Sequence, residues 1–208
     1  MENAIYLILG LTSVVGAGVA GWRVWALRWN RVVPAPLADA VAECRTRDDV
    51  KKLRQICQEH PSTLARLLLL AANHLDWPKT ENAGSLETAA RHEVVRLERG
   101  IVVLEIIVGI APLLGLVGTI VGMMTVFNGI GDAGLNNAAK LASGISMILK
   151  ATLIGLLIAI PALVAWGYLS KRVEVFAVEL ETLCDEFIRR QYVRKNDRPK
   201  APESQNPA

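Results

Sequence analysis

The chain has 208 residues with a formal net charge of +3, and 52% of its residues are apolar. This small charge, without a dense Lys/Arg face, excludes a typical nucleic-acid-binding protein. The three cysteines, Cys44, Cys57 and Cys184, form no CxxC motif and have no His at ligand spacing, which argues against a metal site or a disulfide framework. The sequence contains no phosphate loop or nucleophile motif, so we expect neither a cofactor nor enzymatic activity.

The first apolar stretch runs from Ala4 to Trp22 without a charge. At about 1.5 Å per residue it forms about 28 Å of helix, close to the thickness of a bilayer's hydrocarbon core. No positive charge precedes it and arginines follow from Arg23 on, so the pattern predicts an uncleaved anchor with its N-terminus outside rather than a secretory signal. We assign residues 1–29 to this first transmembrane helix.

Residues 30–99 are predicted to form a cytoplasmic helical region. Apolar residues recur at helical spacing over Asp39–Glu59 and over Ser62–Leu75, and a Trp-Pro pair then marks a stop. We expect a loop over Lys79–Ser85. A charged helix over Glu87–Arg99 should run straight into the second span.

The second apolar stretch is uncharged, and we assign residues 100–127 to the second transmembrane helix. The third transmembrane helix is assigned to residues 141–170, with Lys150 as its one charge. A helix of that length reaches about 45 Å, so it should project beyond the bilayer. The link at 128–140 is rich in Gly and Asn and is predicted to be a short periplasmic turn.

After the third span, residues 171–194 are predicted to continue as a cytoplasmic helical extension. They carry an apolar stripe at spacings of three and four, formed by Val173, Phe176, Leu180, Leu183 and Phe187. Residues 195–208 are polar and contain proline, so we expect a disordered tail.

The expected fold class is an all-α integral membrane protein with three transmembrane helices. Its long second and third spans extend into a cytoplasmic helical bundle. All Lys and Arg residues except Lys140 and Lys150 lie in residues 23–99 and 171–208. The positive-inside rule therefore places the N-terminus and the 128–140 turn outside, and the C-terminus in the cytoplasm.

In lipid, helices associate through close packing of small residues. The second span contains a GxxxG motif, and one hydroxyl, Thr119, shares a stripe with its small residues. In the third span Thr152 shares a face with Ile148 and Ala159. Each hydroxyl can donate a hydrogen bond to a backbone carbonyl one turn earlier in its own helix, or it can line a narrow pore that contains water. The candidate packing residues are Pro112, Gly115, Gly118, Gly122, Gly155 and Pro161.

Two intramembrane charges are candidate functional residues. Glu105 lies near the cytoplasmic start of the second span, where an acid can simply reach headgroups or water. Lys150 lies deeper, and a buried lysine costs several kcal/mol unless it reaches water or a partner. If Thr119 and Thr152 share one depth, Glu105 lies about 21 Å from that depth toward the cytoplasm, too far to pair with Lys150. Lys150 can instead snorkel to the outer surface or pair with another subunit.

Two segments resemble the ExbB/TolQ/MotA proton-channel family. They are Ala-Pro-Leu-Leu-Gly-Leu-Val-Gly-Thr-Ile-Val-Gly-Met at 111–123 and Lys-Ala-Thr-Leu-Ile-Gly-Leu-Leu-Ile-Ala-Ile-Pro-Ala at 150–162. The resemblance is closer to the ExbB/TolQ branch than to the flagellar branch, which typically has four spans. Many ExbB and TolQ chains carry a glutamate where this chain has Met147, and Lys150 appears nearby instead.

The resemblance implies a homo-oligomer, a pentamer, in a bacterial inner membrane. Its ring would surround a dimer of a single-span ExbD/TolR-like partner whose aspartate binds the ion. By the same resemblance, Thr119 and Thr152 face the lumen. A TonB-like protein is a further expected partner.

The function expected from this resemblance is the pore-forming subunit of an ion-driven motor. It would couple a flow of ions, which we expect to be protons, to mechanical work in the cell envelope, such as TonB-type import. The alternative is a non-conducting membrane scaffold that recruits partners through its cytoplasmic helices.

Overall fold

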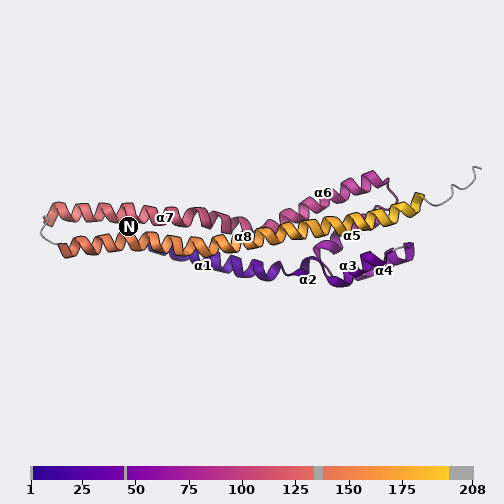
Figure 1. Ribbon diagram of the computed structural model, residues 1–208, viewed down its shortest axis with the longest axis horizontal. Helices are drawn as coiled ribbons and strands as arrows, with labels where there is room; N and C mark the ends of the chain where they lie inside the picture. The colour runs from indigo at the N-terminus through magenta and orange to yellow at the C-terminus, as the bar shows by residue number, and fades with distance from the viewer. Residues whose placement is uncertain (1, 45, 134–137, 197–208) are drawn as a thin grey trace, which may run out of the picture. The chain divides into compact units, whose positions relative to one another are not determined.

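The computed structural model describes residues 2–44, 46–133 and 138–196, whose regular elements are all α-helices (Figure 1). The helices are α1 (Glu2–Ala26), α2 (Trp29–Val32), α3 (Ala35–Glu43), α4 (Arg47–Glu59), α5 (Thr63–Asn73), α6 (Lys79–Glu98), α7 (Ile101–Ala133) and α8 (Ala138–Asn196). They divide into two compact units. The span unit comprises the described residues up to Ala26 and within Glu98–Arg172, and the bundle unit comprises those within Leu27–Leu97 and from Val173 to Asn196.

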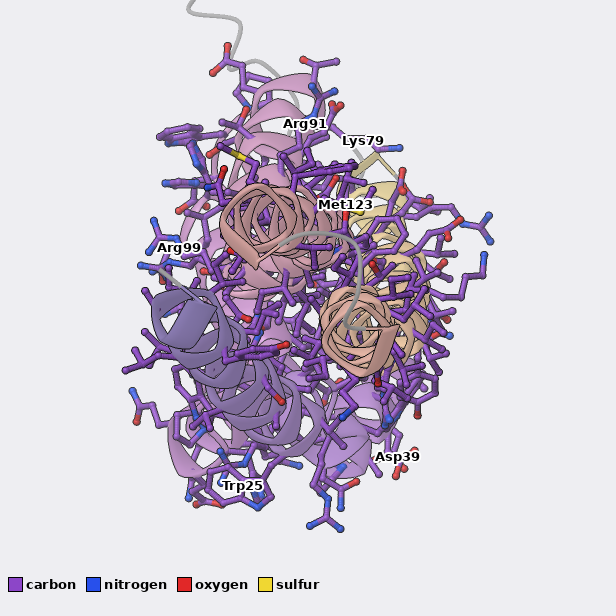
Figure 2. All side chains as sticks on the ribbon, turned by 90° about the vertical axis from the view of Figure 1, so that its left-hand side faces the viewer. Trp25, Asp39, Lys79, Arg91, Arg99 and Met123 are labelled. Carbon is purple, nitrogen blue, oxygen red and sulfur yellow. The ribbon has the colours of Figure 1, made fainter. Side chains whose placement is uncertain are left out.

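Three helices of the described chain are long and apolar enough to cross a membrane, as the sequence predicts. These stretches cover Ala4–Ala26 and Ile101–Asn128, and a third begins at Gly144. Large apolar side chains point outward from them, among them Trp25 and Met123, which are labelled in Figure 2 and are 53% and 43% exposed. Helices that face lipid require such an apolar exterior. The predicted fold class, all-α with three apolar spans, is confirmed.

Within the span unit, α7 packs on both α1 and α8. Gly16 of α1 lies against Ile107 of α7, where an added Cβ would be 3.2 Å from the Ile107 side chain. Ile107 and Ala111 form an apolar cluster with Ala159 and Ala162 of α8. The small residues thus mark the helix contacts, as expected for packing in lipid.

The helix before the second span does not run straight into it. The prediction of one continuous helix was wrong, because α6 ends at Glu98 and α7 begins at Ile101. Gly100 between them has a φ of +84°, a left-handed conformation that glycine adopts at little cost. An added Cβ there would lie 3.3 Å from Cδ of Arg23, so α1 packs directly over this break.

The core of the bundle unit is built from leucine-rich helices and the end of α8. All five residues of the predicted apolar stripe on α8 are buried, from Val173 to Phe187. Phe176 is fully buried and contacts Trp29, with ring centroids 5.2 Å apart. Leu64 and Leu68 of α5 are also fully buried. Helical spacing therefore located this core correctly.

The predicted helix over Asp39–Glu59 is in fact two helices, α3 and α4. Thr46 starts the second with a capping box: the Asp49 N–H donates to Thr46 Oγ1 at 3.2 Å, and the Thr46 N–H donates to Asp49 Oδ2 at 2.6 Å. This exchange satisfies two backbone donors at a helix start and so favours a new helix there. The next predicted helix corresponds to α5, which Ser62 caps through the N–H of Ala65 at 3.1 Å.

The predicted loop over Lys79–Ser85 was wrong, because α6 already begins at Lys79. The carbonyl of Pro78 accepts hydrogen bonds from Glu81 and Asn82, each at 3.1 Å, so the Trp-Pro pair starts this helix. Proline is favoured where a helix begins, since its missing N–H is not needed there. Asn82 then donates to the hydroxyl of Tyr192 on α8 at 3.1 Å and anchors the first turn.

Two further predictions fall partly outside the described residues. The predicted turn at 128–140 overlaps the last residues of α7 and the first of α8, and its centre, 134–137, lies outside them. Of the predicted tail at 195–208, Lys195 and Asn196 belong to α8. The remaining residues, 197–208, also lie outside the described part of the chain.

Candidate ion pathway between α7 and α8

The spans α7 and α8 run antiparallel and side by side (Figure 1). Gly115 faces Thr152 and Gly155, Gly122 faces Ile148, and Gly144 faces Val126. As residue numbers increase along α7, the numbers of the facing residues on α8 therefore decrease. This register places Thr119 and Thr152 within about one helical turn of the same depth.

Glycine permits the close approach of these two helices. A Cβ added to Gly155 would lie 2.7 Å from the carbonyl oxygen of Ala111, and one added to Gly115 would lie 3.1 Å from the Ala151 oxygen. Gly118 and Gly122 face side chains instead. A Cβ added to Gly118 would lie 2.8 Å from Ala151 Cβ, and one added to Gly122 would lie 2.7 Å from Ile148 Cγ1. The predicted glycines of both spans thus lie in one seam.

The two predicted prolines occupy helix interiors. Pro112 is half-buried in α7, and Pro161 is exposed on α8. Because proline has no N–H, the carbonyls of Val108 and Leu157 receive no helical hydrogen bond from them. Pro112 directly follows the seam residue Ala111, and Pro161 lies between Ala159 and Ala162, which belong to the apolar cluster shared with α7.

The hydroxyls of the spans differ in their hydrogen bonds. Thr119 donates to the carbonyl of Leu116 at 2.6 Å, which is the local bond commonly made by threonine in membrane helices. Thr125 makes the same kind of bond to Val121 at 3.0 Å. Thr152 is half-buried, and none of the described residues makes such a bond to its hydroxyl.

Thr119 and Thr152 lie on the same flank of the α7–α8 seam. Gly118 contacts both Ala151 of α8 and Ile5 of α1, so α1 covers the flank on which Gly118 and Ala151 lie. Each threonine follows one of these residues in the chain and is rotated by about 100° about its helix. For antiparallel helices these rotations turn both threonines away from α1. The seam therefore presents two hydroxyls on the one flank that α1 leaves uncovered.

The two candidate charges occupy different faces. Glu105 is exposed and precedes Thr119 by two heptads, so it lies on nearly the same stripe of α7, about 21 Å along the helix. Lys150 is exposed at the depth of Thr119, but it points away from α7 on the outer face of α8. It neighbours Leu149 and Leu153, which are 65% and 56% exposed. The side chain of Met147 lies outside the described ones.

Ala151 is a seam residue that reasoning from the sequence missed. It is 3% exposed and contacts Gly118. Its neighbour Thr152 was the residue predicted from the sequence instead. A signal was available, because Ala151, Gly155 and Ala159 form a small-residue pattern at spacings of four. Val126 against Gly144 extends the seam by about one more turn beyond Gly122, and no small-residue pattern in the sequence indicated this contact.

Comparison with known proteins gives one family and several relatives. The profile of the MotA/TolQ/ExbB proton channel family matches residues 60–182. The putative biopolymer transport protein ExbB-like 1 of Synechocystis sp. is 32% identical over 191 residues, which cover 85% of this chain and 72% of that protein. The biopolymer transport protein ExbB of Helicobacter pylori is 37% identical over 81 residues, covering 39% and 56%.

The Tol-Pal system protein TolQ of Pseudomonas aeruginosa is 35% identical over 105 residues, which cover 50% of this chain and 46% of that protein. The chain thus spans about half the length of the Helicobacter and Pseudomonas relatives. The family match includes both threonines, the seam glycines and the α6 helix.

Proposed function

Because this chain belongs to the MotA/TolQ/ExbB proton channel family, we propose that it is the pore-forming subunit of an ion-driven motor in a bacterial inner membrane. The predicted resemblance to this family is confirmed. The observation that carries the proposal is the position of Thr119 and Thr152 at similar depth on one flank of the seam. Such a flank can line a pore once further copies surround it.

The assembly we propose is a homopentamer around a dimer of a single-span, ExbD/TolR-like partner. The partner supplies the aspartate that takes up the ion, which is a proton. Ion flow would then drive work in the cell envelope, since relatives are named for biopolymer transport and for the Tol-Pal system. The distribution of Lys and Arg supports a cytoplasmic bundle unit and a periplasmic N-terminus.

The hydroxyls suit proton passage because each can donate one hydrogen bond and accept others. Thr119 directs its own proton to Leu116, so its oxygen is left to accept bonds from water in the lumen. Glu105 lies on nearly the same stripe of α7, toward the cytoplasm, and would mark the cytoplasmic mouth of the pore. Lys150 lies on the opposite face of α8, away from the proposed pathway.

Three Thr→Val variants test the pore role, because valine keeps the shape of the side chain and removes its hydroxyl. We expect Thr119→Val and Thr152→Val to abolish proton flux in membrane vesicles that contain the complex and a trapped pH dye. Thr125→Val is the matched control: it removes a similar local bond from an exposed site on α7 and should conduct normally. Pull-down with mass spectrometry should recover the single-span partner with all three.

Normal flux through Thr152→Val would overturn the pore role of this residue. If the pull-down recovers only soluble proteins and no single-span partner, the scaffold alternative replaces the motor. In that case variants of the bundle unit, not of the threonines, should abolish function.

A further inference from the structure

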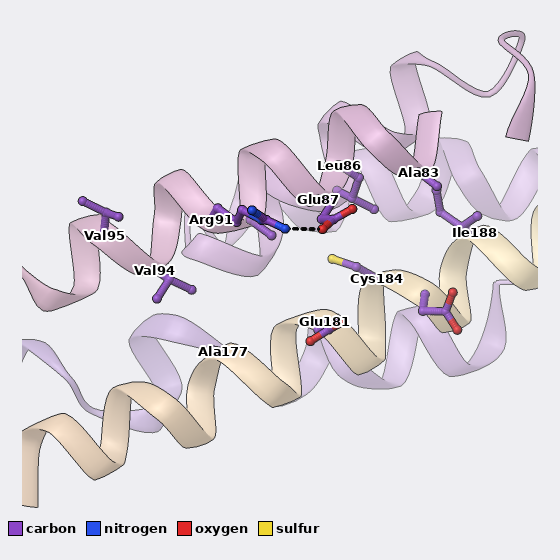
Figure 3. Close-up of a pocket in the computed structure, with 12 residues that line it drawn as sticks. Ala83, Leu86, Glu87, Arg91, Val94, Val95, Ala177, Glu181, Cys184 and Ile188 are labelled. Atoms are coloured by element: carbon purple, nitrogen blue, oxygen red, sulfur yellow. Dashed lines mark hydrogen bonds and ion pairs between the residues drawn. The ribbon is translucent and has the colours of Figure 1, made fainter. Parts of the chain in front are cut away.

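A groove lies between α6 and α8 within the bundle unit (Figure 3). Its volume is about 610 Å³, and its lining combines apolar side chains of both helices, several of them small, with four charged side chains. Ala83, Ala90 and Val94 line it from α6, and Ala177 and Cys184 line it from α8. Small residues leave room for another chain's side chains to approach both helix backbones.

The rim of this groove is acidic. Glu181 and Asp185 of α8 are exposed along one edge. Glu87 on α6 is paired with Arg91 at 2.7 Å, as Figure 3 shows, so that guanidinium already has a carboxylate partner. The groove therefore suits an apolar ridge that carries a positive charge.

Another face of α8 provides such a ridge. Val175, Val178 and Val193 are 44%, 60% and 58% exposed, although they lie in the bundle unit. Thr182 and Arg189 are exposed on the same face, and at 100° per residue all five fall within about 60° of arc. We refer to these five residues as the valine strip. It is rotated by about 100° or more from the middle of the groove-lining face of α8.

Resting on the homo-oligomer of the proposed function, we propose that the valine strip of one copy docks into the α6/α8 groove of a second copy. The valines would fill the space between the alanines, and Arg189 would meet the carboxylates of Glu181 and Asp185. A contact between two different surfaces is heterologous and leaves one groove and one strip open at the ends of any incomplete assembly. Closure into a ring fills both.

The height of the two surfaces along α8 supports a ring. The groove is lined by α8 residues between 177 and 188, and the valine strip extends from 175 to 193. Copies in a cyclic ring are related by rotation without translation, so their matching surfaces must lie at one height. Two surfaces at different heights would instead build an open helical filament.

Cysteine cross-linking of the full chain in its own membranes tests this contact. We would combine Ala90→Cys in the groove with Thr182→Cys in the strip, replace Cys184 by Ala, and add a short bismaleimide. Cys44 and Cys57 are 1% and 2% exposed, so the reagent does not reach their thiols, and burial also raises the pKa of each thiol to about 11. The expected product is a ladder of oligomers that ends at one size.

Single-cysteine chains distinguish a heterologous contact from a symmetric one. Co-expression of an Ala90→Cys chain with a Thr182→Cys chain should give dimers only, and neither chain alone should cross-link. Lys52→Cys, at an exposed site on α4, replaces Thr182→Cys in the control and should give no ladder. In the co-expressed pair, Arg189→Glu on the Thr182→Cys chain should reduce the dimer about tenfold, and Asp185→Arg on the Ala90→Cys chain should restore it. Placing the two changes on different chains excludes rescue through the i,i+4 pair within one helix.

Cross-linking of either single-cysteine chain alone would overturn the proposal in favour of a symmetric contact. Native mass spectrometry of the extracted complex separates the remaining outcomes. A multimer without the ladder would overturn this interface and leave the proposed function standing. A monomer would refute the ring itself.

Discussion

Gly155 of α8 lies directly against the backbone of Ala111 on α7, so that an added Cβ would be 2.7 Å from the Ala111 carbonyl oxygen. The obstacle is backbone rather than a flexible side chain, and it cannot move without shifting the helix. The seam between the two spans therefore depends on the absence of a side chain at this position.

We expect Gly155→Ala to destabilise the chain by about 1–3 kcal/mol, the usual cost of overpacking. Thermal unfolding of the purified chain in detergent, followed by circular dichroism, measures the change. Gly167→Ala is the matched control, since Gly167 lies on the same helix and an added Cβ meets nothing within 4 Å. An equal melting temperature for both variants would contradict the close seam.

The break between α6 and α7 gives a second prediction. Gly100 has a φ of +84°, so Gly100→Ala should destabilise the chain by about 1–2 kcal/mol. Gly100→Asn should cost less, because asparagine tolerates left-handed backbone. Gly84→Ala should instead stabilise by about 1 kcal/mol, since Gly84 is exposed within helix α6 and an added Cβ meets nothing within 4 Å. Equal effects of Ala and Asn at position 100 would contradict the backbone argument.

Apolar length and periodicity were sufficient to predict the three spans and the buried stripe of α8. Both signals depend on many residues, so they tolerate local exceptions. The helix boundaries depended on single residues, and there the predictions failed. Thr46 starts α4 only because Asp49 returns its hydrogen bond, and Gly100 breaks a helix that its charged neighbours would continue.

The candidate site was predictable in part. The small residues of both spans were visible as a pattern, but the pairing of Gly115 with Thr152 depends on the register of two helices, which spacing within each helix does not specify. Spacing within each helix also does not specify which flank of the seam α1 covers. The contact of Ile5 with Gly118 in the structure shows it.

Acid should weaken the bundle unit through Glu93. Arg66 donates to Glu93 Oε1 at 2.9 Å, and this hydrogen bonding holds the pKa of the Glu93 carboxyl below its ordinary value. A depressed folded-state pKa stabilises the fold above the unfolded-state pKa, about 4.3, and the contribution is lost as pH falls through the folded value. Because Arg66 is half exposed, we expect only about 1 kcal/mol from this pair.

Glu93→Gln should therefore lower the melting temperature at pH 7 and reduce its further decrease between about pH 5 and pH 2, the range that includes the lowered folded-state pKa. Glu87→Gln, which removes one carboxylate of an exposed pair with Arg91, serves as the control and should leave both values nearly unchanged. A Glu93→Gln chain as acid-sensitive as the original would place the titrating group elsewhere.

The hydroxyl of Tyr192 connects the end of α8 to the segment between α5 and α6. It lies 2.9 Å from the Trp77 carbonyl oxygen and 3.2 Å from that of His74, and it accepts from Asn82 at 3.1 Å. Tyr192→Phe keeps the ring and leaves the amide of Asn82, a fully buried residue, with one hydrogen bond fewer. We expect a loss of about 1–3 kcal/mol, because buried polar groups that lose a partner are costly.

Hydrogen exchange tests the position of this effect as well as its size. Amides in the first turn of α6 should exchange faster in Tyr192→Phe, while those of α4 remain protected, since the Asp49–Thr46 cap is unchanged. Asn82→Ala should expose the same turn, because it also removes the bond to the Ala71 carbonyl, which is 3.1 Å long. If the double variant is no less stable than either single one, both act through this one connection. Additive losses would mean that they stabilise the unit separately.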